Sequence, residues 1–98
     1  MTFRLIIRPE AEADIEESFL WYEDQAGGLG HEFRAELRRA LARIKSTPMS
    51  FPKIYRDVRR VLVSRFPYSF FFFVEREAIV ITACVHQRRN PQVWRNRR

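Results

Sequence analysis

The order of apolar and polar residues at the start of the chain predicts a short strand followed by a helix. The opening stretch TFRLIIRPE places Phe3, Leu5 and Ile7 on one face of an extended chain, which is the period of a half-buried strand. Pro9 then suits the first position of a helix, and the acidic residues after it suit the N-terminal end of the helix dipole.

Two amphipathic helices are predicted in the first half of the chain. The first ends at the glycine-rich stretch QAGGLG, which supplies the positive-φ positions of a helix end and a turn. The second runs from about residue 29 to residue 45 and stops before Pro48. A short glycine loop between two such helices predicts an antiparallel helical hairpin. Each helix carries one apolar stripe: Ala11, Ile15, Phe19 and Tyr22 in the first, and Phe33, Leu37, Leu41 and Ile44 in the second.

Three further strands are predicted in the second half, over Arg59–Arg65, Phe70–Glu75 and Ala78–Val85. The stretch MSFPKIYRD before them is interpreted as a loop. The last strand is almost wholly apolar and β-branched, as expected of a central strand that is covered on both faces. The order strand, helix, helix and three strands predicts an α+β fold in one domain over residues 1–98, with the helical hairpin packed on a four-stranded antiparallel sheet.

Four consecutive phenylalanines occupy the middle of the predicted sheet. In a strand, Phe70 and Phe72 point to one face, and Phe71 and Phe73 to the other. One pair can meet the helix stripes, whereas few residues are left to cover the second pair. An uncovered aromatic face usually marks a partner site, so Phe71 and Phe73 are expected to contact a partner.

Composition excludes several classes of protein. A transmembrane helix needs about 20 apolar residues, and the longest unbroken apolar run here, residues 70–74, has five. No apolar signal segment develops at the N-terminus. The single cysteine, Cys84, cannot form an internal disulfide and is expected to be a small core residue. These features predict a cytoplasmic protein.

Charge is distributed unevenly between the two halves of the chain. Residues 1–52 contain seven Lys/Arg and nine Asp/Glu residues, a net charge of −2, whereas residues 53–98 contain eleven and three, a net charge of +8. Such a basic half favours a polyanionic partner, either nucleic acid or an acidic protein segment. The plainer interpretation is a charged surface that keeps the protein soluble.

Arginines are the main candidates for binding, because the guanidinium fork holds phosphate groups and does not deprotonate. For the C-terminal Arg95, Arg97 and Arg98 we favour a solvated, frayed tail. Trp94 is expected to hold the C-terminus on the sheet. The candidates for contacting the target or a nucleic acid are Arg59, Arg60, Arg65, Arg88 and Arg89.

His86 is the one candidate for proton transfer in the basic half. A histidine after a strand can act as an acid or base, although a hydrogen-bonded structural role is the simpler interpretation. No second obvious proton-transfer residue stands beside it in the sequence, and Lys53, Tyr55 and Tyr68 are weak alternatives. No metal-ligand cluster and no cofactor-binding motif is present in the sequence.

Several segments together resemble the RelE/ParE family of toxins from bacterial type II toxin–antitoxin systems. They are the opening strand with PEAEADIEES, the helix–loop–helix WYEDQAGGLGHEF, the loop PMSFP, the stretch RRVLVSRFPYSFFFFV and the ending ACVHQRRNPQVW. The resemblance covers nearly the whole chain and implies two N-terminal helices against a curved, mainly antiparallel sheet.

The resemblance implies a growth-arresting toxin that a cognate antitoxin neutralises in a hetero-oligomeric complex. The antitoxin is expected to be acidic and to fold on binding, with Trp21, Tyr22, Phe71 and Phe73 as its contact residues. No cofactor, metal or membrane is implied.

Two targets are compatible with the resemblance. ParE-like members poison DNA gyrase and have no established hydrolytic site, and the motif RFPY with the ending VHQRRNP favours them. RelE-like members cleave mRNA on the ribosome, and for that endoribonuclease activity the catalytic candidates are Arg65, His86 and Arg88. A non-toxic protein-binding module is the third possibility.

Overall fold

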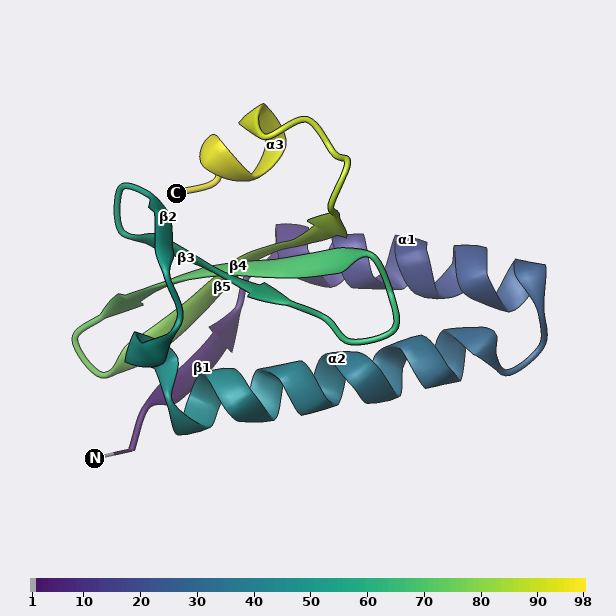
Figure 1. Cartoon of the computed structure of the whole chain (residues 1–98), viewed down its shortest axis with the longest axis horizontal. Helices are drawn as coiled ribbons and strands as arrows, with labels where there is room; N and C mark the ends of the chain where they lie inside the picture. Colours follow the sequence, from purple (N-terminus) through teal and green to yellow (C-terminus); the bar gives the residue numbers. More distant parts are fainter. Residues whose placement is uncertain (1) are drawn as a thin grey trace.

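A five-stranded sheet carries two long helices on one face and the C-terminal segment on the other (Figure 1). The computed structural model describes residues 2–98. The strand order is β1-β5-β4-β3-β2, with β1 parallel to β5 and every other neighbouring pair antiparallel. In chain order the elements are β1 (Arg4–Ile7), α1 (Pro9–Gln25), α2 (Leu29–Ser46), the 3-10 turn η1 (Pro48–Ser50), β2 (Lys53–Tyr55), β3 (Val58–Leu62), β4 (Tyr68–Glu75), β5 (Ala78–His86) and α3 (Gln92–Arg95).

The α+β class, with its N-terminal hairpin and mainly antiparallel sheet, is confirmed, but the number of strands is five, not four. The additional strand is β2, which lies in the stretch interpreted as a loop and pairs with β3. It has only three residues and follows Pro52 directly, so the sequence holds too few alternating positions to reveal it.

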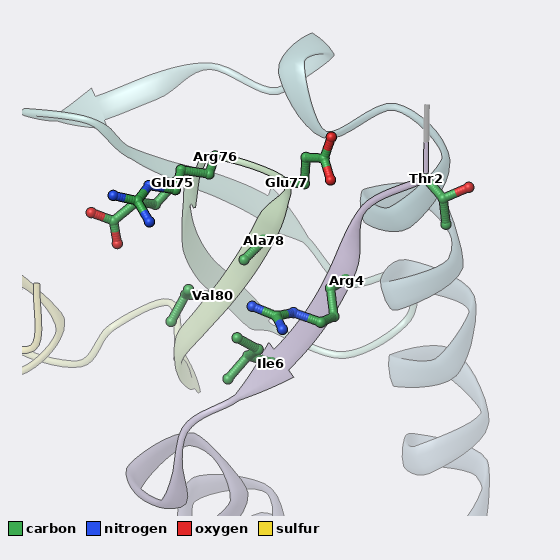
Figure 2. A pocket seen from close by; sticks show the side chains of 8 residues that line it. All are labelled: Thr2, Arg4, Ile6, Glu75, Arg76, Glu77, Ala78 and Val80. Atoms are coloured by element: carbon green, nitrogen blue, oxygen red, sulfur yellow. The ribbon is translucent and has the colours of Figure 1, made fainter.

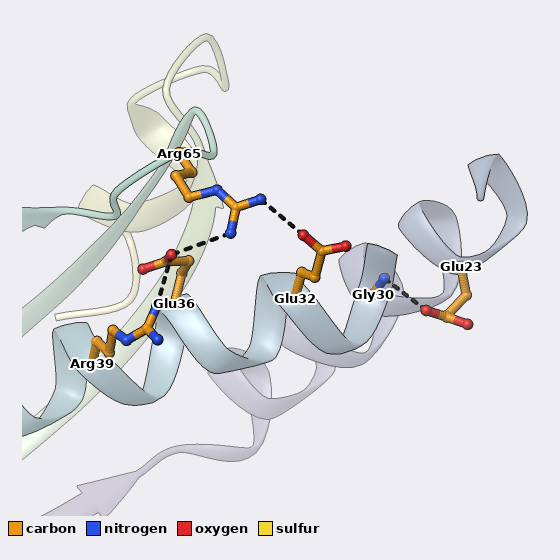
Figure 3. Close-up of polar contacts among 6 residues, drawn as sticks. All are labelled: Glu23, Gly30, Glu32, Glu36, Arg39 and Arg65. Carbon is orange, nitrogen blue, oxygen red and sulfur yellow. Dashed lines mark hydrogen bonds and ion pairs between the residues drawn. The ribbon is translucent and has the colours of Figure 1, made fainter. Parts of the chain in front are cut away.

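The helical hairpin forms where the sequence predicts it. Pro9 is the first residue of α1, and α2 begins after Gly28, whose φ of 91° is the left-handed conformation that glycine adopts without strain. The carboxylate of Glu23 on α1 accepts hydrogen bonds from the backbone N–H groups of Gly28 and Gly30, at 3.2 and 2.7 Å. An α1 side chain therefore satisfies free N–H groups at the start of α2 (Figure 3).

The main core lies between this hairpin and the sheet. Phe33, Leu37 and Ile44 of α2 are buried there together with Phe70 and Phe72 of β4. Burial of this aromatic and aliphatic surface is the dominant favourable contribution to folding. Half of the phenylalanine run is therefore core, as predicted.

The other half of the run is also covered, and the prediction of an exposed Phe71 and Phe73 face is wrong. Their exposed fractions are 4% and 1%. The Trp94 ring stacks on Phe71 with 4.3 Å between ring centroids and 10° between ring planes, and the Arg98 guanidinium lies 3.5 Å from the centroid of Phe73. The C-terminal segment thus provides a second core on the outer face of the sheet, and the predicted role of Trp94 is confirmed.

The last residues are fixed by charge as well as by stacking, so the prediction of a frayed arginine tail is wrong. Arg97 forms an ion pair with the partly buried Asp14 of α1, with 3.2 Å between Nη2 and Oδ1. Arg98 forms a two-pronged pair with Asp57, both N–O distances being 2.7 Å. Carboxylates of two distant segments, Asp14 of α1 and Asp57 between β2 and β3, hold the C-terminus in place.

Within residues 2–98, none of the helices is long and apolar enough to cross a membrane.

Candidate functional site

Arg65 lies in the bend between β3 and β4, not in a strand as predicted. Its φ is 71°, and β3 ends three residues earlier at Leu62. The guanidinium pairs with Glu32 at 2.8 Å and with Glu36 at 3.5 Å, both on α2 (Figure 3). The hydrogen bond to Glu32 raises the pKa of Arg65 above its ordinary value. Its positive charge is therefore already balanced within the fold.

Glu36 is a residue that the sequence analysis missed. Its side chain is 6% exposed and accepts a hydrogen bond from Arg39 at 2.9 Å as well as the contact from Arg65. A buried carboxylate needs such partners, because an unpaired charge in the interior is costly. Its position three residues after the stripe residue Phe33 is the signal that could have placed it on the buried face.

Arg59 on β3 also has a role within the fold. Its Nη1 donates hydrogen bonds to the backbone carbonyls of Met49 and Phe51, at 3.2 and 2.5 Å. It thereby holds η1 and the residue after it against the sheet. Both bonds use Nη1, so the remaining N–H groups of the guanidinium can still donate to a partner.

His86 ends β5 at the meeting point of several cavities. Its Nδ1 accepts a hydrogen bond from the backbone N–H of Arg88 at 3.0 Å, which fixes the turn that follows. The ring packs edge-on against Tyr68, with 5.4 Å between centroids. The predicted structural hydrogen bond is therefore present, and it leaves Nε2 as the free ring nitrogen.

A cavity of about 380 Å³ on the outer face of the sheet brings together several of the predicted residues. Arg60 lies opposite Phe71 in the β3–β4 register, so both side chains share one face. The cavity is lined in part by Arg60, Phe71, His86, Gln87, Arg89 and Trp94. The sequence analysis missed Gln87 as a lining residue, because only the turn after β5 brings it next to β3.

A second cavity, of about 700 Å³, runs beside α1. Trp21 and Leu20 are exposed there by 56% and 54%, and Tyr68 and His86 form part of the same lining. Tyr22 also lines it, but packs against the core residues Phe33 and Phe66. Of the four predicted antitoxin contacts, Trp21 is the one with a largely exposed side chain.

A third cavity, of about 850 Å³, contains none of the predicted site residues. It lies along the edge strand β1, where Arg4 and Ile6 stand beside Ala78 and Val80 of β5 (Figure 2). Glu75 and Glu77 add negative charge to its rim.

The three residues proposed for RNA cleavage do not converge on one cavity. His86 lines the cavity of the outer face and the cavity beside α1, whereas the guanidinium of Arg65 is held by α2. Arg88 supplies a backbone N–H to His86 and has an exposed side chain. In the part of the chain that the structure describes, Arg60, Arg88 and Arg89 form no ion pair.

Comparison with known proteins identifies the family of this chain. A family model described as the ParE toxin of the type II toxin–antitoxin system parDE matches residues 5–91. The chain belongs to the ParE toxin family. The predicted toxin family is thereby confirmed, and membership of a toxin–antitoxin family implies an antitoxin partner.

A solved structure supports the same fold. A chain from the chromosomal ParDE toxin–antitoxin system of P. aeruginosa matches with a TM-score of 0.78 and 18% sequence identity. The match covers 87% of this ParE-family chain and 96% of the other. At this identity the likeness establishes a shared fold. Among curated proteins no match was found.

Proposed function

We propose that this ParE-family toxin arrests growth by poisoning DNA gyrase in the cytoplasm, without hydrolytic chemistry of its own. The observation that carries the proposal is the position of Arg65, whose guanidinium pairs with Glu32 and Glu36. A ribonuclease site requires charge stabilisation and proton transfer at the same phosphate. Because Arg65 pairs with carboxylates of α2, it does not join His86 at such a site.

The remaining basic residues are the candidates for contact with the target. Arg59 is occupied by backbone carbonyls and Arg65 by carboxylates. Arg60, Arg88 and Arg89 are exposed, and their guanidinium groups can donate to an anionic partner without breaking an ion pair of the fold. This surface is the one that we assign to the target.

A ribosome-dependent endoribonuclease is the second candidate function. The observation that favours it is His86 in one cavity with Arg60 and Arg89, since a histidine between arginines can transfer a proton near a bound phosphate. In that case the arginines beside His86, and not Arg65, would stabilise the charge.

His86→Gln separates the two functions. Glutamine offers an oxygen that can replace Nδ1 as acceptor for the Arg88 N–H, but it cannot transfer a proton at neutral pH. For a gyrase poison we expect unchanged growth arrest, with filamentation and a DNA-damage response, when the variant is overproduced without antitoxin. Loss of general acid–base catalysis in a ribonuclease would instead lower cleavage by roughly 10² to 10⁴-fold and abolish the arrest.

The same expression experiment tests toxicity itself. Overproduction of the wild-type chain should stop growth, and co-expression of the cognate antitoxin should restore it. Rapid translation arrest without filamentation in the wild type, lost in His86→Gln, would contradict the gyrase proposal. Normal growth with folded protein would indicate a non-toxic binding module.

We further propose that the antitoxin covers the cavity beside α1. Leu20 and Trp21 offer exposed apolar surface there, and an amphipathic segment could bury both. His86 lines this cavity as well as that of the outer face, so a segment that continues past His86 would reach Arg88 and Arg89. Acidic residues in that part of the antitoxin would pair with these arginines.

A further inference from the structure

The cavity on the outer face of the sheet carries positive charge that the fold leaves unbalanced. Arg60 and Arg89 line it, and within residues 2–98 neither forms an ion pair. No carboxylate is among its lining residues. The cavity beside α1, by contrast, contains Glu17 and Asp24. Arg89 also borders a small neighbouring cavity with Asp14 and Glu17, so Arg60 is the arginine of the outer cavity with no carboxylate among the residues that share a cavity with it. Two guanidinium groups that converge in one cavity repel each other, and an anion bound between them relieves that repulsion.

The polar groups of this cavity suit a phosphate in particular. A guanidinium group presents several N–H donors in a planar fork that matches phosphate oxygens. Because Nδ1 of His86 accepts the N–H of Arg88, the hydrogen of the neutral ring resides on Nε2 and is available as a further donor.

The size and the apolar part of the lining allow more than an inorganic ion. The volume of about 380 Å³ falls within the range of small-molecule sites, roughly 300–1,000 Å³. The stacked pair Phe71 and Trp94 forms part of its lining. Aromatic surface beside arginines is typical of sites that hold the sugar and base next to a bound phosphate.

We propose that this cavity binds a phosphate ester, with a phosphodiester group of single-stranded DNA as its ligand. Arg60 approaches the phosphate from β3, and Arg89 approaches it from the turn after β5. Phe71 and Trp94, which are 4% and 7% exposed, offer only the rim of their stacked pair to the attached nucleoside. The inference stands independently of gyrase poisoning, because the toxin alone should show this binding.

Trp94 provides a direct optical test. The chain has two tryptophans, so in a Trp21→Phe background the intrinsic fluorescence reports on the cavity. The probe is an oligodeoxythymidylate of about ten nucleotides, within the range that single-strand sites span. Addition of this probe is expected to change the Trp94 emission in a saturable manner.

Matched variants identify the groups that bind. Arg60→Gln and Arg89→Gln are each expected to weaken binding at least about tenfold, the loss that follows removal of a charged hydrogen bond. Each should also reduce the slope of log affinity against log salt concentration by about 1. Arg38→Gln removes the same charge from an exposed position on α2 and should leave affinity within about twofold at 0.15 M salt. Thermal unfolding checks that all three variants are folded.

Competition experiments and the variants distinguish a phosphate site from binding by charge alone. Thymidine monophosphate that displaces the oligomer would identify one phosphate ester as the ligand, whereas displacement only by longer strands would identify the DNA backbone. Both results support a phosphate site. Equal losses in Arg60→Gln, Arg89→Gln and Arg38→Gln would overturn the proposal, because charge alone would then account for binding. Tighter binding of a polyglutamate peptide than of the oligomer would overturn it in favour of an acidic protein segment.

Discussion

At Gly30 the backbone of α2 lies close against α1. A Cβ atom at this position would lie 2.6 Å from Cγ of Glu23 and 2.7 Å from the carbonyl oxygen of Phe19. The second of these is backbone and cannot rotate away. The same close approach allows the N–H of Gly30 to donate a hydrogen bond to Glu23 at 2.7 Å. Because glycine has no side chain at this position, the two helices can pack this closely.

Gly30→Ala should therefore destabilise the protein by about 1–3 kcal/mol, the usual cost of added volume at a closely packed position. Gly27→Ala is the matched control, because nothing lies within 4 Å of its added Cβ and its φ is not positive. Urea denaturation of both variants measures the free energy of unfolding. Equal stability of the two would show that the helices can separate at no cost.

The Asp57–Arg98 pair provides a pH-dependent contact at the C-terminus. The hydrogen bond from Arg98 lowers the pKa of Asp57 below its ordinary value of 3.8. A lowered folded-state pKa means that the stabilisation is present above pH 4 and is lost as the pH falls through the folded pKa. Since the two side chains are 30% and 43% exposed, the pair contributes roughly 0.2–1 kcal/mol.

Asp57→Asn tests this contribution. The variant should be less stable than the wild type at pH 6, and the difference in free energy of unfolding should shrink as the pH is lowered below about 4. Urea titrations of both proteins at several pH values provide the measurement. A difference that stays constant down to pH 3 would mean that the carboxylate charge does not hold the C-terminus.

At the scale of the elements, the C-terminal segment covers part of the outer face of the sheet. Trp94, in a helix of only four residues, is 7% exposed and covers Phe71. The sheet would otherwise present its outer aromatic residues to solvent. Because of this short element, the sheet has two buried faces instead of one.

Trp94→Ala should expose Phe71 and lower the stability by about 3 kcal/mol, at the low end of values for buried aromatic residues. The variant should also bind more of a hydrophobic dye than the wild type, in which Leu20 and Trp21 already offer some exposed apolar surface. Trp21→Ala is the control, because Trp21 is 56% exposed and contributes little to the core. Dye binding by the wild type, equal to that of the Trp94 variant, would show that the outer face is open in solution.

The helices and the long strands were predictable because their signals are local. The apolar stripes of α1 and α2 and the continuous apolar run of β4 can each be recognised within one short stretch of sequence. The covering of Phe71 and Phe73 was not predictable in this way. It depends on contacts between Trp94 and Phe71 and between Arg97 and Asp14, which are far apart in the sequence.

At the scale of the whole molecule, the candidate site could be predicted only in part, because it too depends on contacts between residues that are far apart in the sequence. Sequence spacing indicated that Arg65, His86 and several other basic residues stand near strand ends, but not which of them share a cavity. The β3–β4 register and the turn after β5 bring Arg60, His86 and Arg89 together. The carboxylates of Glu32 and Glu36 draw Arg65 to α2 instead.

The molecule as a whole combines a basic outer surface with a cavity beside α1 at which Leu20 and Trp21 are exposed. His86 lies where they meet.

The most direct test of the gyrase proposal is a cleavage assay with purified DNA gyrase, supercoiled plasmid and the chain freed from any antitoxin. We expect the toxin to abolish supercoiling and to cause linear DNA to accumulate as trapped cleavage complexes. The His86→Gln variant should act as strongly as the wild type. Gyrase that continues to supercoil normally in the presence of folded toxin would contradict the account. The ribosome would then be the next target to test, with His86, Arg60 and Arg89 as the first residues to change.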